Sequence, residues 1–250
     1  MPRSTLLCLH GFLGFAADWQ PVQQHLQEWG NCLTPDLPGH DATPLLPGQQ
    51  SYASWTAWLA QWLQARTTER VILVGYSLGG RVALAFAAAY PQRVQALALL
   101  SAHPGLESPS ARAERARADA QRAAQIRQQG LPPFLEGWYR LPLFALEGQP
   151  DVRAALVASR QRQDPAAMAR VIEEMSPGRQ PSLWGALAAL RVPLLYLAGA
   201  HDEKYRRVAA RVARHVPGGR VCILSGVGHM LLWQAGGQVG ENLKKWLDFS

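Results

Sequence analysis

The chain has no run of about eighteen consecutive apolar residues, which is the length that a membrane-spanning helix needs. Its first apolar stretch, residues 6–9, is too short for a secretory signal peptide, and His10-Gly11 follow it without a small-residue cleavage site. We therefore interpret residues 6–9 as a strand, and we expect a cytoplasmic protein without a membrane span.

Cysteine is scarce as well. Cys8, Cys32 and Cys222 are odd in number, lie far apart in apolar or strand-like runs, and have no spacing typical of a metal site. Buried free thiols in a reducing compartment are therefore expected. The sequence predicts no metal and no organic cofactor, and it indicates no oligomeric state.

Lysine is the third scarcity, because only Lys204, Lys244 and Lys245 are present and nearly all of the 25 basic residues are arginines. Many of these arginines lie in residues 103–190, where acidic residues are interleaved with them. That pattern lacks the one-sided basic face typical of nucleic-acid binders, so we expect no nucleic-acid partner. Arginine suits planar recognition of carboxylates or phosphates, and GC-rich coding DNA favours it equally.

Short apolar runs alternate along the chain with longer helical patterns, which is typical of β-α-β units around a parallel sheet. The runs are almost continuously apolar, as a sheet covered on both faces requires. The expected strands are residues 6–9, 32–34, 71–74, 96–100, 194–197 and 220–224. The expected helices lie near residues 18–29, 52–65, 78–90, 206–215 and 238–247.

The alternation breaks once, over about residues 103–190, which contain no convincing strand and are rich in Ala, Arg and Gln. Residues 107–129 read as one long helix that Pro132-Pro133 ends, and Pro150 and Pro165 open further short helices. We expect one domain over residues 1–250, with this helical insertion as a lid.

The run Gly75-Tyr76-Ser77-Leu78-Gly79-Gly80 directly follows an expected strand and directly precedes an expected helix. It is a G-x-S-x-G motif in the strand–turn–helix context that a nucleophile elbow requires. The turn is so tight that Ser77 is expected to be strained, and side chains at positions 75 and 79 would collide with neighbouring backbone.

A serine hydroxyl needs an imidazole and a group that orients the imidazole. Asp202 follows the strand expected at 194–197, and His229 follows the strand expected at 220–224. The order Ser, Asp, His, each after a strand, is that of the α/β-hydrolase fold, a mostly parallel, doubly wound sheet with a lid. The alternatives are Glu203 as the acid, and His25, His201 and His215 as surface histidines without a role.

Two further features complete the expected site. The loop His10-Gly11-Phe12 follows the first strand, so the backbone N–H groups of Phe12 and Leu78 are the candidate oxyanion-hole donors. Arg81 lies four residues after Ser77 on the elbow helix and shares a face with it, which favours an anionic substrate. The alternative is a surface arginine that snorkels into solvent.

The run from Gly75 to Arg81 resembles that of the 2-succinyl-6-hydroxy-2,4-cyclohexadiene-1-carboxylate (SHCHC) synthases, menaquinone-pathway enzymes with this fold. Further runs extend the resemblance over most of the chain: Leu9-His10-Gly11-Phe12, Asp36-Leu37-Pro38-Gly39-His40, His103-Pro104-Gly105-Leu106, Arg112-Ala113-Glu114-Arg115, Trp138-Tyr139, Ser159-Arg160 and Gln180-Pro181-Ser182-Leu183. Two departures are Asp41, where relatives usually have Gly, and Met230, where they often have Asn.

The resemblance implies a lyase that eliminates pyruvate from a substrate with three carboxylates, with Ser77, His229 and Asp202 acting as the base. It implies that Arg81, Arg115 and Arg160 bind carboxylates and that Tyr76, Trp138 and Tyr139 line the site. The alternative function is a serine hydrolase, either a carboxylesterase or a carbon–carbon bond hydrolase, for a small anionic substrate. A non-catalytic receptor on the same fold is the third hypothesis, which the complete triad disfavours.

Overall fold

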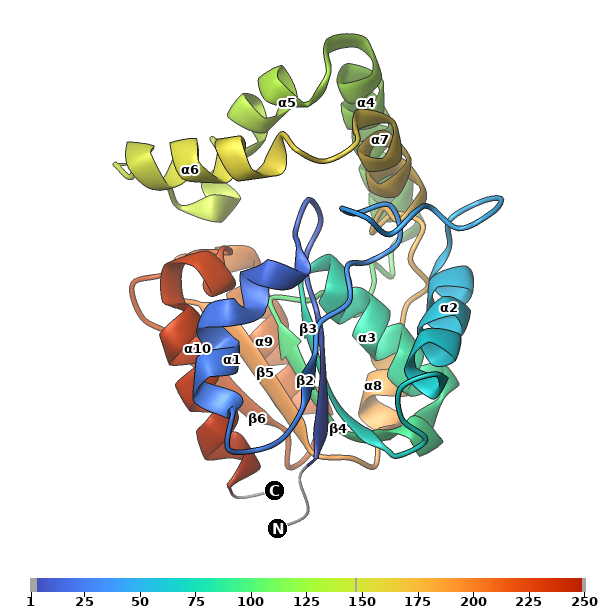
Figure 1. Ribbon diagram of the computed structural model, residues 1–250, viewed down its shortest axis with the longest axis vertical. Coiled ribbons are helices and arrows are strands. Elements are labelled where there is room, and N and C mark those ends of the chain that lie inside the picture. Colours follow the sequence, from blue (N-terminus) through green and yellow to red (C-terminus); the bar gives the residue numbers. More distant parts are fainter. Residues whose placement is uncertain (1–3, 147, 249–250) are drawn as a thin grey trace.

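The computed structural model describes residues 4–146 and 148–248, and these residues build a parallel sheet with helices on both faces (Figure 1). All described strand pairs are parallel, in the order β2-β1-β3-β4-β5-β6. The strands are β1 (Thr5–Leu9), β2 (Cys32–Leu33), β3 (Val71–Tyr76), β4 (Val94–Leu100), β5 (Leu194–Gly199) and β6 (Arg220–Leu224). The six predicted strands are confirmed, although β3 and β5 each continue for two residues beyond their predicted ends.

Two layers of helices cover the sheet. Helices α1 (Gln20–Leu26) and α10 (Leu231–Leu247) pack together on one face, with the short 3-10 helix Ala16–Trp19 before α1. The other face is covered by α2 (Tyr52–Gln64), α3 (Leu78–Ala89) and α9 (Glu203–His215). The helix predicted at 238–247 is only the second part of α10, because α10 begins at Leu231 and is kinked at Ala235.

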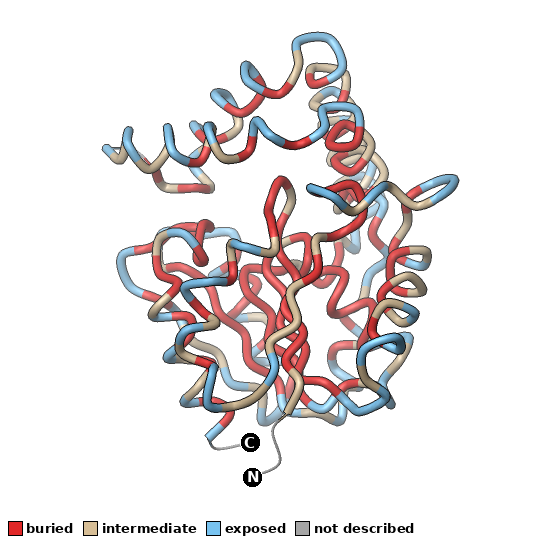
Figure 2. Tube along the Cα trace, viewed as in Figure 1, coloured by how far each residue is buried: buried red, intermediate tan, exposed pale blue. Residues whose placement is uncertain are grey.

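The core lies on both faces of the sheet because successive strand side chains alternate in direction. Leu7 and Leu73 join the cluster beneath α2, α3 and α9, whereas Leu6 and Ile72 join the cluster beneath α1 and α10. The central strands are buried along most of their length (Figure 2). Burial on two faces explains why the strand runs are continuously apolar and not alternating.

Between β4 and β5 the chain forms helices α4 (Pro109–Gln129), α5 (Leu131–Trp138), α6 (Pro150–Arg160), α7 (Pro165–Glu174) and α8 (Trp184–Ala189), with a 3-10 helix at Pro142–Phe144. The first four lie over the carboxyl edge of the sheet, towards which the loop after β1 rises (Figure 1). Helix α8 instead contacts α3. The described part of residues 103–190 is helical as expected, while the single-domain and lid boundaries stay predictions.

Local sequence explains where these helices start. Pro109, Pro150 and Pro165 each occupy the first turn of a helix, where a missing N–H costs no hydrogen bond. Asp164 caps α7 by accepting hydrogen bonds from the backbone of Ala166 and Ala167. Within residues 4–146 and 148–248, no helix combines the length and the apolar character needed to cross a bilayer.

Candidate active site

Ser77 occupies the single-residue turn between β3 and α3, with φ 51° and ψ −110°, a conformation that non-glycine residues rarely adopt. Its N–H donates to the Leu100 carbonyl at 2.9 Å. A Cβ at Gly75 would lie 2.5 Å from the Gly80 Cα, and one at Gly79 would lie 2.3 Å from the Leu9 carbonyl oxygen. The predicted strain and the predicted need for glycine at 75 and 79 are therefore both present.

The loops after β5 and β6 bring Asp202 and His229 to this serine. The His229 Nε2 lies 3.0 Å from the Ser77 Oγ, and the His229 Nδ1 lies 2.7 Å from the Asp202 Oδ2. A carboxylate only accepts, so Nδ1–H is the donor and Nε2 is left to accept the serine proton. The other Asp202 oxygen accepts from the Tyr205 N–H at 3.2 Å, which fixes the carboxylate. The three side chains form one hydrogen-bonded line, and Asp202 and His229 are both buried.

The alternative acid and histidines lie elsewhere. Glu203 is exposed and pairs with Arg207 one turn along α9. His215 is exposed and donates a hydrogen bond from Nδ1 to the Arg211 carbonyl, and His201 is exposed as well. His25 lies beside Gly240 at the α1–α10 contact. None of these groups contacts Ser77 in the part of the chain that the structure describes.

The loop after β1 approaches the elbow as expected for an oxyanion hole. A Cβ at Gly11 would lie 2.9 Å from the Tyr76 ring and 3.4 Å from the Ser77 Cβ. Leu78 is the first residue of α3, so its N–H has no partner within the helix. Between residues 4–146 and 148–248, neither the Phe12 nor the Leu78 N–H donates to another backbone group. Both donors are therefore available to an oxygen above Ser77.

A buried imidazole holds this loop in place. His10 donates from Nδ1 to the Gly11 carbonyl at 2.8 Å, and its Nε2 accepts from the Leu37 N–H at 2.9 Å. Burial lowers the pKa of His10 to about 4, so the ring is neutral and keeps one donor and one acceptor. The two hydrogen bonds of the buried His10 ring thus hold the loop that carries Phe12.

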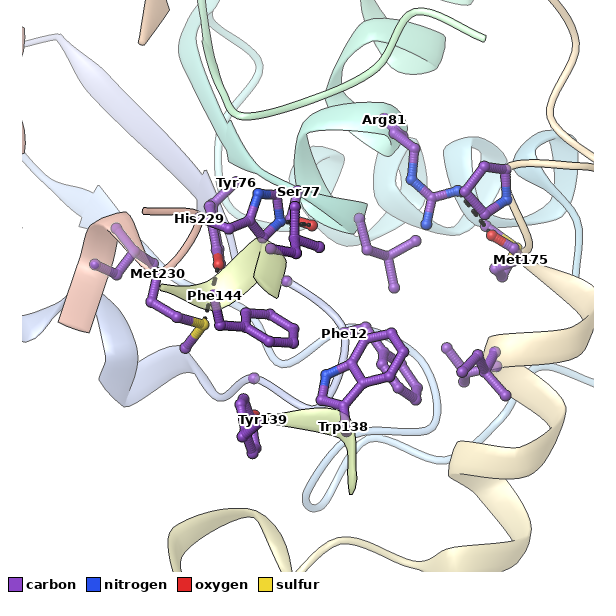
Figure 3. Close-up of a pocket in the computed structure, with 18 of the residues that line it drawn as sticks. Phe12, Tyr76, Ser77, Arg81, Trp138, Tyr139, Phe144, Met175, His229 and Met230 are labelled. Carbon is purple, nitrogen blue, oxygen red and sulfur yellow. Dashed lines mark hydrogen bonds between the residues drawn. The ribbon is translucent and has the colours of Figure 1, made fainter. Parts of the chain in front are cut away.

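A cleft between the sheet edge and the lid helices opens onto Ser77 (Figure 3). Its lining combines aromatic and aliphatic side chains with four cations. The lining residues are Gly11, Phe12, Gly14, Asp18, Tyr76, Ser77, Leu78, Arg81, Arg115, Asp119, Trp138, Tyr139, Leu143, Phe144, Arg160, Val171, Ile172, Met175, Pro177, Lys204, Tyr205, His229, Met230, Leu232 and Trp233. All site residues expected from the sequence belong to this set except Asp202, which lies behind His229.

Arg81 is buried and directed at the cleft. Its Nη1 donates to the Met175 carbonyl at 2.8 Å (Figure 3). The same nitrogen also contacts the Tyr52 hydroxyl. Burial raises the pKa of Tyr52 to about 12, so this phenol is neutral beside the guanidinium. No carboxylate pairs with Arg81 among the described residues, so its charge is available to a ligand.

The lid arginines are held by acidic side chains. Arg115 donates from Nε to Asp119 at 2.7 Å, and Arg160 donates from Nη2 to Asp18 at 2.7 Å. Asp119 is fully buried and also accepts from Arg122 at 2.6 Å and from Ser176 at 2.7 Å. The buried Nε and Nη1 of Arg160 have no hydrogen-bond partner within residues 4–146 and 148–248. Each lid arginine is thus oriented by a carboxylate and keeps donors for a ligand.

The three aromatic residues expected in the site all line the cleft. The Tyr76 hydroxyl donates to the Met230 sulfur at 3.6 Å, and burial keeps the pKa of Tyr76 well above its usual value. Trp138 meets the Phe12 ring edge-to-face at 5.8 Å. Tyr139 lies 5.2 Å from the Phe144 ring (Figure 3). Arg122, on α4, places its guanidinium over Trp138 at 5.5 Å.

The two departures from the resembling family fit the structure. Asp41 has a φ of 48°, in the left-handed region that glycine adopts freely and that Asp tolerates better than most residues. Its N–H donates to the Gln163 side chain at 2.9 Å. Met230 supplies the sulfur that accepts from Tyr76. Neither departure displaces the Ser77–His229 contact.

Sequence reasoning missed several residues of the cleft, namely Asp18, Asp119, Phe144, Lys204, Tyr205 and Trp233. Tyr205 packs on His229 with 4.7 Å between ring centroids, and Phe144 lies 6.1 Å from the same ring. For Tyr205 the sequence does offer a signal, because it lies three residues after the expected triad acid Asp202. Within residues 4–146 and 148–248, no group of three or more His, Cys, Asp or Glu side chains is placed to hold a metal ion.

Comparison with known proteins agrees with this geometry. Residues 4–236 match the family described as alpha/beta hydrolase fold. The chain is 38% identical to the 2-succinyl-6-hydroxy-2,4-cyclohexadiene-1-carboxylate synthase of Pectobacterium atrosepticum, over 82% of this chain and 81% of that protein. It is 37% identical to the Salmonella schwarzengrund synthase of the same name, over 84% of this chain and 82% of that protein. The solved structure of MenH from S. aureus superposes with a TM-score of 0.93 at 27% identity, covering 100% of this chain and 95% of that one. The chain therefore belongs to the α/β-hydrolase fold family and, within it, to the family of the SHCHC synthases.

Proposed function

We propose that this chain is a carbon–oxygen lyase of menaquinone or phylloquinone biosynthesis. It eliminates pyruvate from an enolpyruvyl succinyl-cyclohexene carboxylate and forms SHCHC. The observation that carries the proposal is the Ser77–His229–Asp202 line, which opens into a cation-lined cleft in a member of this synthase family. A substrate with three carboxylates matches the charge of that cleft.

In this reaction the triad acts as a base, not as a source of a covalent intermediate. His229 takes the Ser77 proton, and the serine oxygen removes the proton from the carbon next to the succinyl ketone. The electron pair of that C–H bond enters the ring, and the bond to the enolpyruvyl oxygen breaks. The proton ends on the departing enolpyruvate or on solvent, and no water is consumed. Asp202 stabilises the imidazolium that forms meanwhile.

The remaining groups hold the charges in place. The Phe12 and Leu78 N–H groups stabilise the oxygen of the enolate-like transition state, which requires donors aimed at developing negative charge. Arg81, Arg115 and Arg160 bind carboxylates, and the Phe12, Trp138 and Tyr139 rings cover the cyclohexene ring. Charge-assisted bonds of this kind are roughly twice as strong as neutral ones, so the arginines dominate recognition.

The test is direct. The protein is incubated with the enolpyruvyl cyclohexene tricarboxylate, and released pyruvate is followed through lactate dehydrogenase. We expect turnover by the wild type and a loss of about 10²–10⁴-fold in kcat in Ser77→Ala, the usual contribution of a general base. Ser110→Ala on the exposed start of α4 is the matched control. A folded wild-type sample that releases no pyruvate above the uncatalysed background would refute the proposal.

The same sample separates the lyase from a serine hydrolase. A hydrolase would turn over small p-nitrophenyl esters well, and Arg81→Ala would leave that turnover almost unchanged. A lyase loses pyruvate release when Arg81 is replaced, because the guanidinium positions the anionic substrate.

A further inference from the structure

The four cations of the cleft differ in how their charges are balanced. Arg115 pairs with Asp119, and Arg160 pairs with Asp18. Arg81 instead donates to a carbonyl and meets a phenol, and Lys204 has no ion pair among the described residues. Arg81 and Lys204 are therefore the two cleft cations that have no carboxylate partner among the described residues.

Lys204 lies on the triad side of the cleft. It is the second residue of α9, two positions after Asp202. Its Nζ is 5.3 Å from the centroid of the Tyr205 ring, and that ring packs on His229. Lys204 thus lines the same cleft as Ser77 and His229, and its side chain is exposed there.

Two acidic side chains of this region are already engaged. Glu203 pairs with Arg207 on α9, and Glu107 makes two hydrogen bonds to Arg211. Neither carboxylate is left to neutralise Lys204.

Lys204 and Arg81 both line the cleft and both act on His103, which follows β4 at the carboxyl edge of the sheet. Burial, together with the charges of Lys204 and Arg81, lowers the pKa of His103 to about 4. Arg160 acts instead on Tyr139 and Tyr76, and its own charge is paired with Asp18. In Figure 3, Arg81 and Tyr139 accordingly lie on different sides of Phe12 and Trp138. Arg81 and Lys204 thus give the cleft two charges that no described carboxylate pairs with, whereas Asp18 balances Arg160.

We propose that Lys204 is a further substrate-binding residue, whose ammonium binds a carboxylate of the substrate together with Arg81. This inference rests on the proposed lyase function. A flexible ammonium suits this position, because it can follow the ligand and release the product, whereas Arg81 is fixed by Met175 and Tyr52. A multiply charged anion is expected to bind preferentially at the Arg81–Lys204 end.

The kinetic test compares Lys204→Met with Lys245→Met, which removes the same charge from an exposed position on α10. We expect Lys204→Met to raise KM for the tricarboxylate about tenfold, as loss of one charged hydrogen bond would, with kcat changed less. Lys204→Arg should restore most of the affinity. The rise in KM with added salt should be shallower in Lys204→Met than in the wild type. A KM within twofold of that of Lys245→Met would overturn the assignment.

A second measurement does not depend on turnover. The chain has three lysines, so a lysine-specific acylating reagent followed by peptide mass spectrometry reports on each of them. Succinate or pyruvate should slow the labelling of Lys204 severalfold and leave Lys245 unaffected. Equal labelling with and without these anions would count against Lys204 even if pyruvate release is normal. Protection without pyruvate release would instead retain the anion site and reject the lyase function.

Discussion

Arg160 of helix α6 and Asp18 of the 3-10 helix before α1 form an ion pair of 2.7 Å between side chains that are only 3% and 10% exposed. The contact joins residues 142 positions apart and ties a lid helix to the body of the protein. Asp18 also accepts from the Phe15 N–H and from the Trp233 indole. The Asp18 carboxylate thus fixes both the orientation of Arg160 and the position of α6 against the body of the protein.

Removing one partner of this pair should cost more than removing both. Asp18→Ala leaves a buried guanidinium without its carboxylate, and we expect it to lower the free energy of unfolding by about 3 kcal/mol. Adding Arg160→Met should recover part of that loss, because the uncompensated charge disappears. Urea unfolding of the four proteins in the double-mutant cycle measures the coupling. Additivity of the two single changes within about 0.5 kcal/mol would show that the pair is not coupled.

The strained backbone of Ser77 predicts a stability gain on losing its side chain altogether. Glycine adopts φ 51° freely, whereas alanine at this position keeps the strain. Ser77→Gly should therefore be more stable than Ser77→Ala by about 1 kcal/mol, or roughly 2–4 °C in Tm for a domain of this size. The same pair of changes at Ser110, in the first turn of α4, should give the opposite order. Calorimetry of the four variants decides, and equal Tm values for the two Ser77 variants would contradict strain at the elbow.

Local chain patterns made much of this site predictable. The G-x-S-x-G elbow is a strand, a turn and a helix within a few residues, so its geometry is encoded nearby. Asp202 and His229 could be placed because each follows a strand, and parallel strands end at one edge of the sheet. Arg81 follows from the helical period after Ser77.

The partners of the lid arginines could not be predicted in this way. Arg160 meets Asp18 only because α6 folds back over the start of the chain, and no periodicity relates the two positions. Asp119 lies four residues from Arg115, yet its full burial depends on Ser176 and on the packing of α4 against α7. The sequence carries no signal for Lys204, because a lysine on a helix is usually solvated and only the placement of α9 against the cleft distinguishes it.

Activity should depend on the planar guanidinium geometry of Arg81 as well as on its charge. Arg81→Met removes the cation, and we expect kcat/KM for the tricarboxylate to fall about 10–100-fold. Arg81→Lys should fall between, because an ammonium cannot reproduce the guanidinium contacts with Met175, Tyr52 and a carboxylate together. Arg214→Met, an exposed change on α9, is the charge-matched control. Steady-state pyruvate release measures the effect, and a kcat/KM for Arg81→Met equal to that of the control would contradict carboxylate binding.

Stability should fall as the pH drops from 6.5 towards 4 because of the buried His10. Its folded pKa of about 4 lies below the usual value of 6.5, so in this window the unfolded chain binds a proton that the native protein excludes. The stabilisation is fully present above pH 6.5, and one such histidine removes up to about 1.4 kcal/mol per pH unit below it. Burial lowers the pKa of His40 and His103 too, which adds in the same direction.

Urea unfolding at pH 7, 6 and 5 measures this slope, and the narrow window limits the contribution of carboxylates. His10→Asn keeps a polar side chain beside the Leu37 N–H but takes up no proton. Between pH 6.5 and 5, the free energy of unfolding of His10→Asn should therefore fall less steeply than that of the wild type. The two slopes should differ by close to the uptake of one proton on unfolding, whatever the stability of the variant at pH 7. Parallel curves for the variant and the wild type would mean that His10 is not the group whose protonation the fold resists.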